Sequence, residues 1–352
     1  MRQPRIKPCY RIYQLDDQDR VLIGQGLEKF EIAGPTPEMV EFLRVLDGSS
    51  TASELAQRFP DADAWLDSLG EMGVIDDAAA DHDSPLDPDT ASRWSRQVNY
   101  FRLYERDGWS ATEAQAKLAA ARVVVAGSGA GGSALSRLLA AAGVGQLDLI
   151  DYDDLELSNL PTHVMLDEED VGKPKVEALS RNLRRHNRGI SLNSRNGRFE
   201  GPEDVARFIA GADFFCVAFD RPLGLAPRWA NRAAIEMKVP FGSIGATDKA
   251  GRVGPIVIPG ESACYECIGL SDLKVIRLES AAALTGTTVF LLASIMAGEI
   301  VKFITGFAET SLLNAILFVD LEHLEFSRKT IDQQETCYCS GLSAPGLGLT
   351  GS

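Results

Sequence analysis

The chain has 352 residues, 45% of them hydrophobic, which is enough for more than one domain with a buried core. Its net charge of −15, from 35 Lys and Arg against 50 Asp and Glu, argues against a nucleic-acid-binding protein, because such proteins present a basic face. The N-terminus lacks the apolar core of a signal peptide. The most apolar stretch, residues 287–304, contains Glu299 and Lys302, so we expect a buried helix, no membrane span and a cytoplasmic location.

Residues 1–80 read as a small domain of short strands followed by helices. Alternating or apolar runs predict strands near residues 10–15, 20–24 and 29–32. Three helices are expected after them. Thr36 and Pro37 would begin the first, Thr51 and Glu54 form the capping-box pattern of the second, and the third would span residues 62–72.

This order of elements resembles the winged-helix domain that recognises leader peptides ahead of enzymes that modify ribosomally made peptides. The resemblance implies that a precursor peptide adds a strand to an exposed sheet edge. Residues near Val21, Ile23, Phe30 and Ile32 would form that edge. A plain dimerisation or packing domain is the alternative.

An acidic, proline-containing linker is expected at residues 81–90, within a stretch that runs from Asp76 to Asp89. Beyond it, in residues 91–352, helical segments alternate with apolar strands. The expected helices are near 174–186, 202–210, 224–237 and 288–305, and the strands near 190–194, 213–219, 240–243, 252–258 and 314–320. This alternation predicts an α/β domain with a Rossmann-like, doubly wound and mostly parallel sheet.

A candidate nucleotide site follows the apolar strand at residues 122–126. A glycine-rich turn there lets backbone N–H groups approach phosphates at the start of a helix, and Asp151 ends the next strand, where an acid suits ribose hydroxyls. Asn159 and Lys175 lie beyond it and favour ATP over a dinucleotide. The predicted nucleotide-binding residues are Gly127, Gly129, Ala130, Gly132, Asp151, Asp153, Asn159 and Lys175.

Together these motifs resemble the ThiF-type superfamily of ubiquitin-activating-like adenylyltransferases, over roughly residues 91–340. The resemblance implies that Arg96, in the element Arg93–Gln97, reaches the ATP phosphates, in many members from the partner subunit of a homodimer. Asn159 and Lys175 would contact phosphates and Asp151 the ribose. Asp220, at the end of another apolar strand, would hold Mg²⁺. Arg96, Lys175 and Asp220 are the predicted catalytic residues.

Two cysteine pairs, Cys264 with Cys267 and Cys337 with Cys339, have the tight spacing of metal ligands. Four thiolates from two loops can close a tetrahedral Zn²⁺ site, and the superfamily keeps a structural zinc at these positions. Four free thiols are the alternative. Cys216 lies in an apolar strand and is expected in the core.

Two positions depart from the superfamily pattern. Thr162 stands where an Arg usually contacts phosphate, and Ala130 stands where a Gly is usual. Residues 268–287 contain no cysteine, which disfavours a thioester mechanism.

Three functions remain open. The layout most resembles the microcin-type peptide adenylyltransferases, which implies ATP-dependent adenylation of a carboxyl or carboxamide group in a precursor peptide. A leader-peptide-binding scaffold that partners a cyclodehydratase is the second, and an activator of a sulfur-carrier protein is the third. Transfer of AMP needs cations and Mg²⁺ to neutralise the phosphates but no general base, since a carboxylate is already ionised.

Overall fold

A computed structural model describes the chain in seven stretches. These are residues 1–15, 20–25, 28–106, 108–247, 249–268, 284–335 and 337–340. Contacts divide the chain into two compact units, Met1–Ala116 and Lys117–Ser352. Residues 91–116 therefore group with the first unit, and each unit is described by itself.

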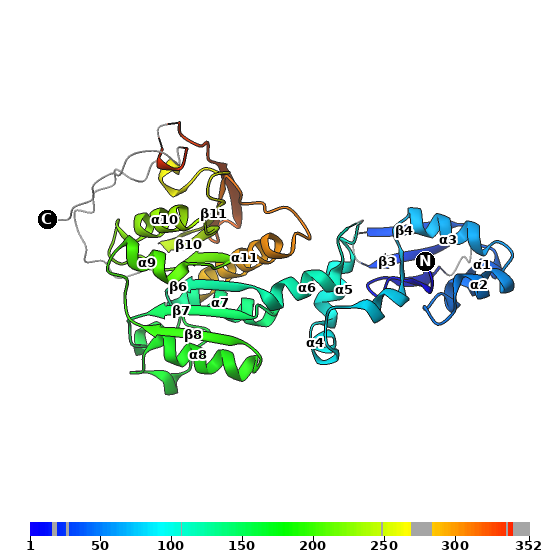
Figure 1. The fold of residues 1–352 in the computed structure, drawn as a ribbon, viewed down its shortest axis with the longest axis horizontal. Coiled ribbons are helices and arrows are strands. Elements are labelled where there is room, and N and C mark those ends of the chain that lie inside the picture. Colours follow the sequence, from blue (N-terminus) through cyan, green and yellow to red (C-terminus); the bar gives the residue numbers. More distant parts are fainter. Residues whose placement is uncertain are drawn as a thin grey trace. The chain divides into compact units, whose positions relative to one another are not determined.

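The first unit begins with a three-stranded sheet and three helices (Figure 1). Antiparallel strands β2 (Arg11–Gln14), β3 (Arg20–Gln25) and β4 (Glu28–Ala33) form the sheet, and β1 (Pro4–Ile6) pairs with β5 (Ile75–Asp77). The helices are α1 (Pro37–Val45), α2 (Ala52–Arg58) and α3 (Ala62–Glu71). The predicted caps are confirmed, because Thr36 accepts from the Met39 amide at 3.1 Å and Thr51 and Glu54 form a capping box.

The predicted sheet edge was partly wrong. Val21 and Ile23 lie on β3, the central strand, and are buried in the core with Phe42 and Leu55. Apolar residues at alternate positions indicate that one face of a strand is buried. Every strand of a sheet has such a face, so the pattern does not distinguish an edge strand from a central one. Phe30 and Ile32 do lie on an edge strand, β4, and the other edge of this sheet is β2.

The acidic segment predicted as a linker is folded. Asp76 lies in β5, and Asp81 lies in the 3₁₀ helix η1 (Ala78–Asp83). Each carboxylate pairs with both Arg5 and Arg102, at distances of 2.6–2.7 Å. Although burial opposes it, hydrogen bonds from these guanidinium groups hold the pKa of Asp81 below its ordinary value. The acidic side chains Asp76 and Asp81 therefore form ion pairs. Composition alone could not distinguish such a folded acidic segment from a solvated linker.

Helices complete the first unit after this segment. They are α4 (Pro88–Arg93), α5 (Ser95–Arg102) and the first part of α6 (Ala111–Ala120), which crosses the boundary between the units. Asp87 caps α4 by accepting from the Asp89 and Thr90 amides, both at 3.0 Å. Phe101 and Leu118 are fully buried, so α5 and α6 are anchored by apolar side chains.

The second unit is built on an eight-stranded sheet in the order β13-β12-β11-β10-β9-β6-β7-β8. Its strands are β6 (Arg122–Ala126), β7 (Gln146–Asp151), β8 (Ser191–Asn196), β9 (Phe214–Val217), β10 (Phe241–Thr247), β11 (Ala250–Val257), β12 (Ala315–Asp320) and β13 (Glu325–Thr330). The five strands from β10 to β8 run parallel, and β11 to β13 continue antiparallel. This confirms the predicted Rossmann-like, mostly parallel α/β fold.

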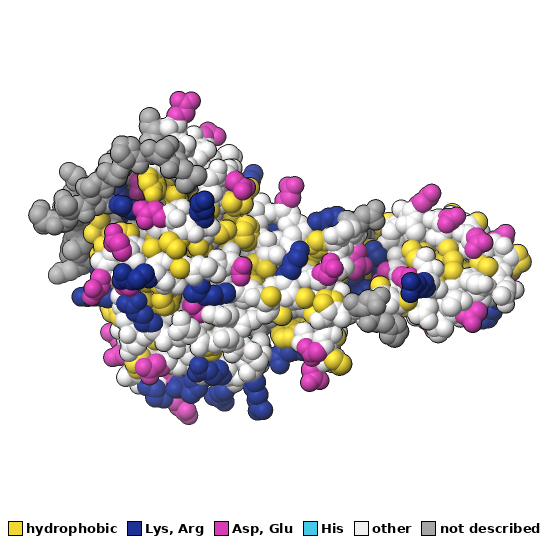
Figure 2. All heavy atoms as spheres, viewed as in Figure 1, with side chains coloured by type: hydrophobic (Ala, Val, Ile, Leu, Met, Phe, Trp, Pro, Cys, Tyr) yellow, Lys and Arg dark blue, Asp and Glu magenta, His cyan; other side chains and the backbone are white. Residues whose placement is uncertain are grey.

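Helices flank this sheet as the right-handed crossover rule requires. Helices α7 (Ala130–Ala142) and α8 (Lys175–His186) connect β6 to β7 to β8, whereas α9 (Pro202–Ile209) and α10 (Ala226–Met237) connect strands in the reverse direction and fall on the other face. Short 3₁₀ helices are η2 (Leu157–Asn159), η3 (Glu168–Asp170), η4 (Tyr265–Ile268) and η5 (Tyr338–Ser340). Figure 2 shows basic side chains gathered over α8, among them Arg181, Arg184, Arg185 and Arg188.

Helix α11 (Gly286–Thr305) is the one helix in the described residues that is long and apolar enough to cross a membrane. It packs against α7, β10 and β11, and Leu292, Met296 and Ile300 are buried. Glu299 is also buried, but it pairs with Lys302 at 2.6 Å and accepts from the Ser311 amide. These contacts match the predicted core helix.

Candidate nucleotide and acceptor site

The site lies where the strand order reverses, between β6 and β9. Strand β6 leads to α7 on one face, and β9 leads to α10 on the other, so their carboxyl ends diverge and leave a crevice. Open α/β sheets bind ligands at such a point. The predicted glycine turn lies here.

The glycines of the turn have different structural roles. Gly127 has φ +99°, and a Cβ there would lie 2.3 Å from the Ala218 carbonyl oxygen; a Cβ on Gly132 would lie 1.8 Å from the Gly127 carbonyl oxygen. Both positions therefore require glycine, Gly127 so that the turn can lie against the residue after β9 and Gly132 so that α7 can pack against the turn. Gly129 caps α7, and a Cβ there would meet nothing within 4 Å. The open space above Gly129, at a helix N-terminus, suits a phosphate.

We expect Gly132→Ala and Gly129→Ala to separate folding from nucleotide binding. Gly132→Ala forces the turn apart, which should lower the free energy of unfolding by about 1–3 kcal/mol and the Tm by several degrees. The second should keep the Tm but weaken Mg-ATP binding, since its methyl enters the open space. Thermal unfolding and calorimetry measure the two quantities, and a normal Tm for Gly132→Ala would contradict the packing argument.

The acidic residues after β7 are tied to the turn. The Asp151 carboxylate accepts from the Ser128 amide at 2.5 Å and the Asp153 amide at 2.8 Å, and burial raises its pKa. Lys175 begins α8 and is buried, with Nζ 3.2 Å from Asp153 Oδ2. The structure therefore brings Asp151, Asp153 and Lys175 together beside the glycine turn.

Asn159 ends η2, and its side-chain oxygen accepts from the Glu156 amide at 3.1 Å. Thr162, which replaces the usual Arg, donates its hydroxyl to the Asn159 carbonyl at 2.9 Å. His163 is 3% exposed, and burial, with the nearby Lys175 charge, lowers its pKa to about 4. It is neutral near pH 7, so neither Thr162 nor His163 supplies a cation in place of the missing Arg.

Two cavities meet at the site. One, of about 120 Å³, is lined by Gly127, Gly129, Asp151, Asp153 and Asp220. The other, of about 480 Å³, also includes Gly129 and Asp220 and adds Ala130, Ser243 and Arg252. Asp220 is exposed at the junction, where a carboxylate could hold a cation between two ligands.

Sequence reasoning missed several residues at this crevice. They are Tyr152, Arg198 and Phe199, which line the smaller cavity. Arg198 and Phe199 follow β8, whose carboxyl end is next to that of β7. Polar or aromatic residues directly after each parallel strand were the signal that could have identified them.

Arg96, predicted to reach the phosphates, lies exposed on α5 in the first unit. Its role therefore stays a prediction.

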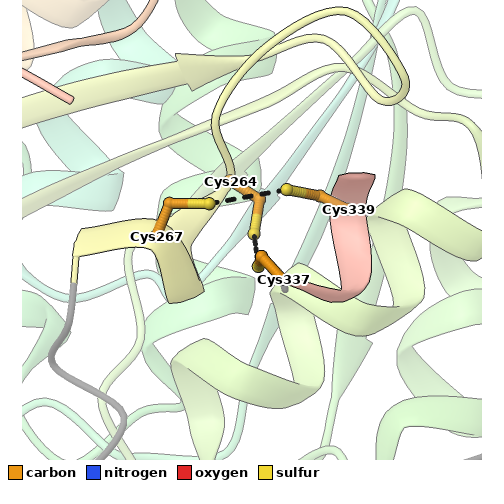
Figure 3. A group of neighbouring side chains, drawn as sticks. All are labelled: Cys264, Cys267, Cys337 and Cys339. Atoms are coloured by element: carbon orange, nitrogen blue, oxygen red, sulfur yellow. Dashed lines mark hydrogen bonds between the residues drawn. The ribbon is translucent and has the colours of Figure 1, made fainter. Parts of the chain in front are cut away.

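The four predicted zinc ligands come together (Figure 3). Their sulfur atoms all lie within 4.8 Å of one another, and the Cys264–Cys337 and Cys267–Cys339 pairs are each 3.5 Å apart. Four Zn–S bonds of about 2.3 Å put sulfurs about 3.8 Å apart at the corners of a tetrahedron. The cluster has the right donors and nearly the right size for Zn²⁺. Burial raises the pKa of the Cys337 thiol to about 11, so a cation would be needed to hold it as thiolate.

Cys216 is fully buried in β9, and burial raises its pKa, which confirms a core role. Residues 269–283, which make up most of the cysteine-free segment 268–287, lie outside the described residues.

The glycine turn, the acid after β7 and the buried lysine at the start of α8 have the arrangement expected of a nucleotide site, and the larger cavity adjoins it. The ThiF family model matches residues 94–340. The chain belongs to the ThiF family and is an ATP-dependent adenylyltransferase.

Known proteins resemble it in sequence and in fold. Protein HesA of Trichormus variabilis is 29% identical over 74% of this chain and 92% of its own length. The sulfur carrier protein ThiS adenylyltransferase of Escherichia coli is 30% identical over 61% of this chain and 81% of its own. The crystal structure of E. coli MccB with ATP has a TM-score of 0.79 and 23% identity, covering 96% of this chain and 99% of that one. MccB with N-formylated MccA gives 0.78 and 22%, with the same coverage.

Proposed function

We propose that this protein adenylates a carboxyl or carboxamide group of a ribosomally made precursor peptide, during maturation of a bacteriocin-like product. The observation that carries the proposal is the larger cavity beside the glycine turn, which would hold the acceptor. Asp220 lines both this cavity and the smaller one. The fold similarity to MccB over 96% of the chain, including the N-terminal unit, supports a peptide as acceptor.

In this reaction an acceptor oxygen bonds to the α-phosphorus of ATP, and the bond from that phosphorus to the pyrophosphate oxygen breaks. Lys175, Asn159 and the amides at the start of α7 would bind the phosphates, and Asp151 the ribose. Asp220 would hold Mg²⁺, which neutralises phosphate charge as the two anions approach. Arg96 would add a cation, across a homodimer if the partner supplies it.

The first unit would bind the leader of the peptide. Both edges of its sheet, β2 and β4, have one strand neighbour each among the described residues. All four residues of β2 are exposed, including Ile12 and Tyr13. An added peptide strand would pair with free backbone groups at one of these edges. Zn²⁺ at the cysteine cluster would be structural, and the cytoplasm is the proposed location.

The test uses the full-length protein, Mg-ATP and the short peptide encoded beside its gene. We expect pyrophosphate release that depends on the peptide, with AMP attached to the peptide by mass. A peptide without its leader should react more slowly, chiefly through a higher KM. Release without peptide dependence, or no release at all, would contradict the proposal.

Two other functions have observations in their favour. The neutral Thr162–His163 loop favours a scaffold that binds peptide without turning over ATP. One relative is the sulfur carrier protein ThiS adenylyltransferase, which favours a small protein acceptor. Tight peptide binding with no nucleotide binding would indicate the first, and turnover with a sulfur-carrier protein the second.

A further inference from the structure

Four arginines gather on one side of α8, in a chain whose net charge is −15 (Figure 2). They are spaced three and four residues apart, which places side chains next to one another on a helix surface. All four residues are exposed, and they line a hollow of about 450 Å³. We call this set the arginine face, and its members are Arg181, Arg184, Arg185 and Arg188.

One member of the arginine face has a counter-charge among the residues that the structure describes. Arg181 pairs with Asp170. Arg184, Arg185 and Arg188 form no ion pair with a described residue. Like charges three or four residues apart on a helix repel one another, and the helix C-terminus offsets this only in part. An anionic partner would remove the repulsion.

The arginine face lies at one edge of the eight-stranded sheet. Arg188 is three residues before β8, which is the edge strand and has β7 as its one strand neighbour in the described part of the chain. A different side of α8 packs against α7, where Asn187 donates to the Ala140 carbonyl at 3.3 Å. Four of the six residues of β8 are exposed. The arginines are therefore close to a strand edge that can accept another strand.

Charge favours one kind of occupant over three others. Two copies joined at β8 would bring two arginine faces together, which repel each other. A nucleic acid carries many phosphates, and the net charge of −15 opposes its approach. A helix that binds a membrane surface also inserts apolar side chains, and the arginine face has none. A short acidic segment of a protein brings only a few carboxylates, which three unpaired guanidinium groups can neutralise.

The spacing of the arginines fits an extended segment. Arg181 and Arg185 are about 6 Å apart along the axis of α8. Alternate side chains of an extended chain lie on one side of it, about 6–7 Å apart. Carboxylates at alternate positions of such a segment therefore match arginines one helical turn apart.

We propose that β8 and the arginine face form a docking surface for an extended acidic segment of another protein. The backbone of the segment extends the sheet at β8, and its carboxylates, at alternate positions, pair with the arginines. The surface is separate from the proposed adenylation site, because Lys175 lies at the other end of α8. A partner docked at β8 leaves the nucleotide site open.

The test measures binding of labelled peptides of about twelve residues to the full-length protein by fluorescence anisotropy. One peptide alternates Glu and Thr, and a second has Gln in place of Glu. A third is the Glu peptide with every backbone nitrogen methylated, which removes its donors for strand pairing. At low salt we expect the Glu peptide to bind at least about tenfold more tightly than the Gln peptide, because several exposed ion pairs act together. The methylated peptide should bind more weakly than the Glu peptide, and high salt should reduce the preference for Glu.

Arg185→Gln/Arg188→Gln should remove most of the preference for Glu and keep the Tm, since both residues are exposed. Arg188→Gln alone, beyond the end of α8, should remove part of it. The matched control is Lys249→Gln/Lys329→Gln, which removes the same charge from exposed positions before β11 and on β13. It should keep the full preference.

Equal affinity for the Glu and Gln peptides in the unsubstituted protein would overturn the inference. So would a preference that survives Arg185→Gln/Arg188→Gln, or undiminished binding of the methylated peptide. A single-stranded oligonucleotide of the same charge is measured in parallel. If it binds as tightly as the Glu peptide, with the same loss in the double variant, the surface binds polyanions in general and the inference is wrong.

Discussion

Asp220→Asn is expected to lower peptide-dependent pyrophosphate release by at least about 10²–10³-fold, in the range found when one electrostatic contact to a transition state is removed. The carboxylate is exposed at the junction of the two cavities, so its replacement should leave the Tm unchanged. An amide is neutral and a poorer ligand for Mg²⁺, so the residual activity should require more Mg²⁺. Initial rates over a range of Mg²⁺ concentrations measure both effects.

Asp213→Asn is the control for this substitution. Asp213 lies just before the start of β9, whereas Asp220 lies after its end. The Asp213 side chain accepts from the Arg122 amide at 2.8 Å, and Asp213 lines neither cavity. It should leave the Mg²⁺ dependence unchanged. An Asp220→Asn enzyme with the rate of the unsubstituted protein would remove Asp220 from the reaction.

The second large effect is expected at the cysteine cluster. Cys264→Ser should abolish binding of one Zn²⁺ per chain and lower the Tm by more than about 10 °C, because zinc binding to a structural site contributes directly to folding. Metal content by mass spectrometry and thermal unfolding measure the two quantities. Chelator treatment should reproduce the Tm loss without any substitution.

Cys9→Ser serves as the control, since Cys9 lies in the first unit and outside the cluster. It should retain the metal and the Tm. Disulfides between the closest pairs, Cys264–Cys337 and Cys267–Cys339, are the alternative to zinc; reductant would then lower the Tm, whereas a chelator would not.

Local chemistry explains why much of the fold could be predicted. The caps at Thr36 and Thr51 depend on residues three positions apart, and the alternation of apolar strands with helices reflects burial of each element against its neighbours. Gly127 and Gly132 were identified because a backbone turn imposes its own steric limits. The superfamily motif added Asp151, Asp153 and Lys175, which do lie together.

What the sequence alone determined was the class of domain, the glycine turn and the pairing of cysteines into two short motifs, since these depend on residues close in the chain. The tertiary structure decided which distant groups meet. It makes β3 a central strand, places Asp76 and Asp81 against Arg5 and Arg102, and brings Cys264 within reach of Cys337. It also places Arg252 at the larger cavity, because strand register, which no local pattern specifies, fixes the side chains that share a face.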